Sequence, residues 1–215
     1  TKNCFHLCHG IVNLAQGRRK AREGTVVDAD DLGAEVTENA KTQIRAVAEE
    51  TLAEEEVSRR AEAIALAAIK FFLLRQNPRI KILFDPKQSL DFQGATGPYC
   101  QYAYARCKSI LRKMEGREEK GTAYSLLVAA EELALLHKLA RLPEAVEDAA
   151  GKYDPSILAQ HVLEIAQTFN QFYHACPVLS EKRELRQARL ALVEATATVI
   201  QNGLLLLGIK TLEAM

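Results

Sequence analysis

The chain has 215 residues, 48% of them hydrophobic and 26% charged, which is ordinary globular composition and enough length for one large domain or two small ones. Its 28 lysines and arginines equal its 28 aspartates and glutamates, so no overall positive charge attracts nucleic acid, and RNA binding would need local patches. No apolar run approaches the roughly 18 residues of a membrane-spanning helix, and no signal core follows the first residues. We therefore expect a soluble, cytoplasmic protein with no membrane partner.

Cysteine and histidine alternate at the start of the chain, as Cys4, His6, Cys8 and His9. Zinc could bind such a cluster, but the spacing differs from that of structural zinc sites, and no distant second pair of ligands completes a tetrahedron. The same alternation is typical of a half-buried strand, so we predict no metal site. The five cysteines form no C-x-x-C pair, which fits a reducing compartment better than a disulfide framework.

A basic loop follows between Gly17 and Gly24, and its cations are Arg18, Arg19, Lys20 and Arg22. In one interpretation it is a solvated turn. In the other it is a mobile loop that meets phosphates, because guanidinium and ammonium groups in a glycine-flanked segment can follow an anionic ligand.

Two helices are expected next. Asp30 can cap the first, whose sequence over residues 35–60 is mostly polar and therefore predicts a surface helix. Ser58 can cap the second, which is richly apolar from Ala61 to Leu74 and must be buried. A short extended segment is predicted from Ile80 to Phe84.

The stretch "GATGPYCQYAYARCKSILRK" predicts a turn followed by a helix that starts near Pro98. The spacing of Cys100, Ala103, Cys107, Ile110, Leu111 and Met114 predicts one apolar stripe. Tyr99, Tyr102, Arg106 and Lys113 fall on a neighbouring flank. The flank is either boundary packing with a solvated face, or a surface whose rings and guanidinium groups contact RNA.

The remaining sequence predicts helices joined by short connections. Leu126, Ala130, Leu133, Leu136 and Ala140 share one predicted face before Pro143. Asp154 caps a helix whose core positions are Leu158, Val162, Ile165, Phe169 and Phe172. Ser180 can cap a last helix with Ala188, Leu192, Ala195 and Val199 inside. We therefore predict a mainly α chain in which three or four antiparallel helices form a bundle.

These segments resemble the C-terminal half of class I arginyl-tRNA synthetases. The resemblance rests on the T-G-P-Y-x-Q-Y-x-x-A-R run, on the helix "SILAQHVLEIAQTFNQFYHACPVL", and on the ending "RLALVEATATVIQNGLLLLGIKTLEAM". It implies a helical, DALR-type anticodon-binding domain over residues 98–215. Residues 1–97 would be a C-terminal remnant of the nucleotide-binding domain with its connecting helices, with "HGIVNL" as a strand and "RRKAREG" as a K-M-S-K-S-type loop.

The resemblance also implies a reaction and its contact residues. The parent enzyme would join arginine to its tRNA through an ATP-derived arginyl-adenylate, with Mg²⁺ expected beside ATP. The implied ATP contacts are Gly10, Ile11, Val12, Arg18, Arg19, Lys20 and Arg22. Contacts near the acceptor side of tRNA would come from Tyr99, Gln101, Tyr102 and Arg106. Contacts with the anticodon would come from Asn170, Tyr173, Arg189 and Met215.

Two departures from the family limit the chemistry of the chain alone. It contains no H-x-G-H element, and its loop reads Arg-Arg-Lys-Ala-Arg from Arg18 to Arg22 in place of the family's small hydroxyl residues. We therefore expect a catalytically incomplete, monomeric piece of the synthetase that binds arginine tRNA, and that meets arginine and ATP only together with an upstream domain. The alternatives are a non-catalytic paralogue acting as an RNA-binding or interaction module, and a helical scaffold unrelated to tRNA.

Overall fold

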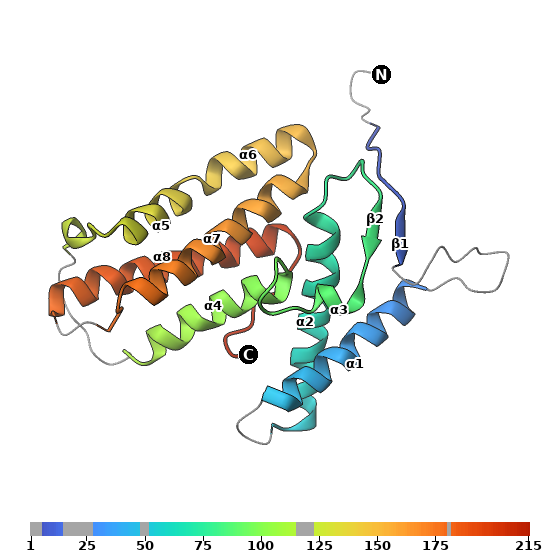
Figure 1. Cartoon of the computed structure of the whole chain (residues 1–215), viewed down its shortest axis with the longest axis horizontal. Coiled ribbons are helices and arrows are strands. Elements are labelled where there is room, and N and C mark those ends of the chain that lie inside the picture. The colour runs from blue at the N-terminus through green and yellow to red at the C-terminus, as the bar shows by residue number, and fades with distance from the viewer. Residues whose placement is uncertain (1–5, 15–27, 48–51, 115–122, 180–181) are drawn as a thin grey trace.

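The computed structural model describes residues 6–14, 28–47, 52–114, 123–179 and 182–215. The elements are β1 (Val12–Leu14), α1 (Ala29–Val47), α2 (Glu54–Leu74), β2 (Ile82–Phe84), α3 (Pro86–Ser89), α4 (Gly97–Arg112), a 3₁₀ turn (Tyr124–Leu126), α5 (Ala130–Ala140), α6 (Leu142–Lys152), α7 (Pro155–Ala175) and α8 (Arg183–Leu206). Helices α4 to α8 form a bundle, while α1, α2 and the strands lie together at one end of it (Figure 1). The prediction of a mainly α fold is confirmed.

The N-terminal part contains two short parallel strands and two packed helices. Strand β1 pairs with β2 so that Val12 lies opposite Ile82, which confirms the extended segment predicted before Phe84. The single polar helix predicted over residues 35–60 is wrong, because α1 ends at Val47 and α2 begins at Glu54. Ser58 therefore lies inside α2 rather than at its cap. The three glutamates in the first turn of α2 favour a helix start there by their charge. The prediction counted them as part of one continuous polar helix and so missed this start.

The turn before α4 explains the glycine and proline that precede the tyrosines. The Thr96 hydroxyl accepts a hydrogen bond from the Tyr99 N–H, and Pro98 occupies the first turn, so the helix starts where the sequence predicts. A Cβ atom on Gly97 would lie 2.3 Å from the Ala67 carbonyl oxygen of α2. Glycine therefore lets the start of α4 contact the backbone of α2 directly.

The two long helices of the bundle, α7 and α8, pack closely. All five predicted core residues of α7 are buried, so that stripe is confirmed. A Cβ atom on Gly203 of α8 would lie 2.4 Å from a methyl group of Val162, so the helices approach at this glycine. The predicted face of α8 is wrong in part, because Ala195 is exposed while Thr196 and Ile200 face the core.

The face predicted for α5 is wrong. Leu133 and Leu136 are 52% and 39% exposed, and the buried side chains are Glu132, Leu135 and Leu139. Leucine occurs on both sides of this helix, so apolar spacing did not distinguish them, and the buried carboxylate has an ionic partner described below. The helix also starts later than predicted, at Ala130, and α6 was not predicted at all.

The last residues return to the N-terminal part of the molecule (Figure 1). Leu212 is buried in a core formed by α1, α2, Phe84 and Leu90, and Met215 packs against it. Conversely, Phe71 of the N-terminal helix α2 is buried in the core of the bundle. The domain boundary at residues 97 and 98 stays a prediction, because each of the two cores takes side chains from across it.

Burial governs the cysteines of α4. It raises the pKa of the Cys100 and Cys107 thiols, so both stay protonated at neutral pH and pack as small apolar groups. The cysteines among the described residues are free. Within the same residues no helix has the length and apolar character needed to cross a membrane.

Candidate nucleic-acid interface

A cavity of about 860 Å³ lies between the helix pair α1–α2 and the helix pair α4–α7. Its lining residues are Gln43, Ile44, Leu52, Arg60, Ile64, Phe92, Gln93, Tyr99, Tyr102, Arg106, Asn170, His174 and Met215. Two of these are arginines, and none of the described lining residues is an aspartate or a glutamate. The cavity therefore combines apolar and aromatic surface with positive side-chain charge.

The polar groups on the α4–α7 side of the cavity are joined in one chain of hydrogen bonds. Asn170 donates from Nδ2 to the Tyr99 hydroxyl at 2.7 Å and accepts from Nη1 of Arg106 at 3.0 Å. Arg106 donates from Nη2 to the Tyr102 hydroxyl at 2.9 Å. Since the amide of Asn170 is bonded at both ends, it holds Tyr99 and Arg106 in fixed positions.

The guanidinium group of Arg106 lies between two aromatic rings. Its Cζ is 4.7 Å from the centre of the Tyr102 ring and 5.0 Å from the centre of the Tyr173 ring. Both distances are within the range of cation–π attraction. Among the described residues Arg106 has no carboxylate partner, so its charge is held in place by neutral groups only.

The structure brings together two groups of residues that the sequence analysis assigned to different parts of tRNA. Tyr99, Tyr102 and Arg106 were predicted near the acceptor side, whereas Asn170 and Met215 were predicted at the anticodon. All five line the same cavity, and Tyr173 reaches it through the Arg106 guanidinium. The structure places these residues on one surface rather than two, because α4 and α7 are neighbours in the bundle.

Two predicted tRNA contacts are engaged inside the protein instead. Gln101 is fully buried and donates from Nε2 to the carbonyl oxygen of Lys210 at 2.6 Å, which ties α4 to the end of the chain. Arg189 donates from Nε to Glu132 at 2.7 Å and from Nη1 to the Pro177 carbonyl at 2.8 Å. Gln101 has no exposed surface, and the charge of Arg189 is paired with a carboxylate, so neither residue enters the proposal below.

The predicted ATP contacts do not assemble into a site within the described residues. The N–H of Gly10 donates to the Pro78 carbonyl at 2.6 Å, and the carbonyl of Ile11 accepts from the Ile82 N–H at 3.0 Å, so these backbone groups already have partners. Val12 begins β1. The loop cations Arg18, Arg19, Lys20 and Arg22 lie outside the described residues, as does Cys4. No group of three or more potential metal ligands occurs in the described part of the chain.

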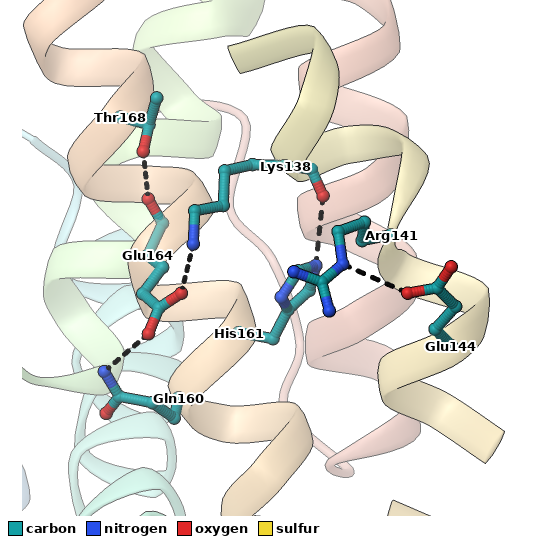
Figure 2. A network of polar contacts seen from close by, with 7 residues as sticks. All are labelled: Lys138, Arg141, Glu144, Gln160, His161, Glu164 and Thr168. Atoms are coloured by element: carbon teal, nitrogen blue, oxygen red, sulfur yellow. Dashed lines mark hydrogen bonds and ion pairs between the residues drawn. The ribbon is translucent and has the colours of Figure 1, made fainter. Parts of the chain in front are cut away.

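A second polar cluster lies on the other side of α7, against α5 and α6 (Figure 2). Lys138 donates to Glu164 at 2.6 Å, and Arg141 donates to Glu144 at 3.0 Å. The His161 ring donates from Nε2 to the Lys138 carbonyl at 3.0 Å. Burial lowers the pKa of His161, while the hydrogen bond from Lys138 lowers that of Glu164. Each of these two cations has a carboxylate partner, so the cluster joins helices and offers little charge to a ligand.

Comparisons with known proteins identify the fold that carries the cavity. A family model described as "DALR anticodon binding domain" matches residues 100–215, more than half of the chain. The chain belongs to this family. The DALR match covers α7 and all of α4 except its first three residues, so it includes Tyr102, Arg106, Asn170 and Tyr173, while Tyr99 lies directly before it. It does not cover α1 and α2, which form the opposite wall of the cavity.

The relatives of this chain include two bacterial proteins named arginine–tRNA ligase. The Treponema denticola protein is 43% identical over 98% of the chain, and the Clostridium acetobutylicum protein is 39% identical over the whole chain. The structure of the Thermus thermophilus arginyl-tRNA synthetase superposes with a TM-score of 0.88, at 34% identity over 98% of the chain and 35% of that protein. The chain spans about 37% of the length of its curated relatives and corresponds to their C-terminal part.

The α1–α2 wall of the cavity was not predicted from the sequence. Arg60, Phe92 and Gln93 carry no local motif that would connect them with the tyrosines of α4. Arg60 reaches the cavity because α2 packs against α4 at Gly97, a contact between residues far apart in the sequence, whereas Phe92 and Gln93 lie in the segment between α3 and α4. The one sequence signal that bears on it is the glycine–proline turn, which allows that close approach.

Proposed function

We propose that the cavity between α1–α2 and α4–α7 binds the anticodon loop of an arginine tRNA, as the C-terminal part of an arginyl-tRNA synthetase. The observation that carries the proposal is the guanidinium group of Arg106, which lies between two tyrosine rings in a cavity without aspartate or glutamate lining. It lies in the region that the DALR description matches.

The chemistry of the cavity suits an unstacked nucleotide. Bases of single-stranded loops bind proteins by stacking on aromatic rings and guanidinium planes, and by hydrogen bonds along their edges. Tyr102 and Tyr173 each keep 38% of their surface exposed, so their rings are accessible. Positive charge from Arg106 suits the phosphates, and Met215 adds a flexible apolar side chain at the rim.

The activity of the whole enzyme is a further part of this proposal. We infer that arginine, ATP and Mg²⁺ are used by an upstream catalytic domain in the cytoplasm, and that the described residues supply binding of tRNA rather than chemistry. The chain alone is then expected to give no arginine-dependent exchange of pyrophosphate into ATP. Exchange well above a no-enzyme control would contradict this division of labour.

Binding of tRNA tests the proposal directly. We expect the chain to bind an arginine tRNA more tightly than tRNAs with unrelated anticodons, measured at one fixed salt concentration because phosphate contacts make affinity salt-dependent. The double variant Tyr102→Phe with Arg106→Gln should bind more weakly with a nearly unchanged melting temperature. Equal affinity for all tRNAs would reject anticodon binding. A large drop in melting temperature with unchanged affinity would make the cluster a packing feature.

A further inference from the structure

Arg60 of α2 lines the same cavity as Arg106 of α4. Its side chain is 18% exposed, and its Nε donates to Glu56 at 2.6 Å. Among the described residues its two terminal nitrogens have no hydrogen-bond partner. A guanidinium group has five N–H donors, so most of the bonding capacity of Arg60 is left for a ligand.

Glu56 fixes this guanidinium group without cancelling the local charge. The same carboxylate binds Arg59 through both oxygens, at 2.7 Å and 2.8 Å, so two cations share one anion. These two arginines lower the pKa of Glu56 to about 2, and the carboxylate stays ionised across the physiological range. The three side chains together keep one net positive charge beside the cavity.

The cavity is large enough for one nucleotide with its phosphate. Its volume of about 860 Å³ lies near the upper end of the range of roughly 300–1,000 Å³ that small-molecule sites occupy. One wall carries the aromatic rings and Arg106, and the other carries Arg60, Ile44 and Phe92. A nucleotide has two chemically different parts, an aromatic base and an anionic phosphate, and the cavity offers aromatic rings to the first and two guanidinium groups to the second.

We propose that Arg60 is a further tRNA-binding residue, which contacts a backbone phosphate of the nucleotide held by the tyrosines. This inference rests on the proposed function of the cavity. It extends the site beyond residues 100–215 of the DALR match, so that the α1–α2 helix pair takes part in RNA binding. Glu56 acts as a positioning residue that aims the guanidinium group.

The test compares Arg60→Gln with Arg59→Gln in the full chain. Arg59 binds the same carboxylate but is 62% exposed and does not line the cavity, so it is a matched control for charge and for the loss of a bond to Glu56. Binding of arginine tRNA is measured over a series of salt concentrations. Arg60→Gln should weaken binding several-fold and reduce the slope of log affinity against log salt by about 0.7, as expected for one lost phosphate contact in a single strand.

The outcomes separate this inference from the proposed function. If Arg106→Gln weakens binding while Arg60→Gln binds with the slope of the wild type, the Arg60 contact is rejected and the cavity remains the tRNA site. Absence of specific binding by the wild type rejects the site itself. Equal losses in the Arg59 and Arg60 variants would also reject the contact, because a general field effect explains them. If Arg60→Gln does not fold, Arg60→Met decides, because it keeps an apolar stem and removes the charge: a reduced slope supports the contact, and the wild-type slope rejects it.

Discussion

Two arginines of the bundle lie in opposite electrostatic surroundings. Arg106, on the α4–α7 side, is held by Asn170, by a tyrosine hydroxyl and by two aromatic rings, all of them neutral. Arg189, on the α5–α8 side, donates to the carboxylate of Glu132, which is 1% exposed. The sequence analysis assigned both residues to tRNA binding. Only Arg106 keeps a positive charge that is not compensated by a neighbouring carboxylate.

The difference shows how a neutral chain can have a surface for a polyanion. Around α5, cations and carboxylates are paired: Lys138 with Glu164, Arg141 with Glu144, and Arg189 with Glu132. The Lys138 and Arg189 pairs join two helices each, and all three pairs leave little positive charge uncompensated. Around the cavity the arginines are held by neutral groups or share a carboxylate, so positive charge remains locally. Pairing, rather than the number of cations, separates the two regions.

The largest expected effect is a loss of folding stability when an ion pair around α5 is broken. Replacing Glu132 by alanine leaves the Arg189 guanidinium without its anion and the Ala129 N–H without its acceptor. We expect the free energy of unfolding to fall by about 3–5 kcal/mol, as for other buried ion pairs that lose one partner. Urea denaturation measures it. The partly exposed neighbour Glu131 is the control, and Glu131→Ala should cost less than about 1 kcal/mol. Equal losses of unfolding free energy in both variants would show that the Glu132–Arg189 pair contributes no more than a surface interaction.

The second effect is on tRNA affinity and separates the two regions directly. Arg106→Gln should raise the dissociation constant for arginine tRNA about tenfold or more, because a charged hydrogen-bond donor contributes roughly 1.5–3 kcal/mol. Lys138→Gln removes the same charge from a cation that is paired with Glu164, and it should leave the affinity unchanged. Equal weakening by both substitutions would show that the total charge of the chain, and not local pairing, controls binding.

A smaller effect is expected from Met215, which lies at the rim of the cavity and packs against the N-terminal core. Met215→Ala should weaken tRNA binding several-fold, since stacking against a base contributes on the order of 1–3 kcal/mol and a thioether lies at the low end. Point substitution is preferable to truncation, because the carbonyl oxygen of Glu213 accepts a hydrogen bond from Arg112 and its carboxylate pairs with Lys108. Unchanged affinity in the folded variant would remove Met215 from the site.

The smallest expected effect is the pH dependence of folding stability that arises from His161. Burial lowers the pKa of His161 below its ordinary value of 6.5, so protonation favours the unfolded chain. The contribution of His161 to stability is present above pH 6.5 and is lost as the pH falls through the lowered pKa. Solvent screening at this partly exposed ring keeps the change small. His161→Gln should flatten the stability profile just below pH 6.5. An unchanged profile would show that another group titrates there.

Local chemistry made some elements predictable and left others ambiguous. The stripe of α7 was predicted correctly because Leu158, Val162 and Phe169 recur on one side and Asp154 caps the start through the Ser156 N–H. In α5, leucines occupy both sides, and nothing in the sequence shows that Glu132 is buried. The helices that carry Arg106 and Asn170 were predicted correctly, but the hydrogen bond between these two side chains spans 64 residues of sequence and could not be predicted from either helix.

By itself, the sequence determined the mainly helical class, the start of α4 at its glycine–proline turn, the core face of α7 and the resemblance to arginyl-tRNA synthetases. These depend on spacing within one segment, on caps and on backbone geometry, which act between neighbouring residues. The tertiary structure alone decided that Gln101 and Arg189 have partners inside the protein. It also decided that Tyr99, Arg106, Asn170 and Met215 line one cavity together with Arg60. The physical reason is that packing between distant segments determines which partner a charged or polar group meets. The sequence of one segment does not specify that partner.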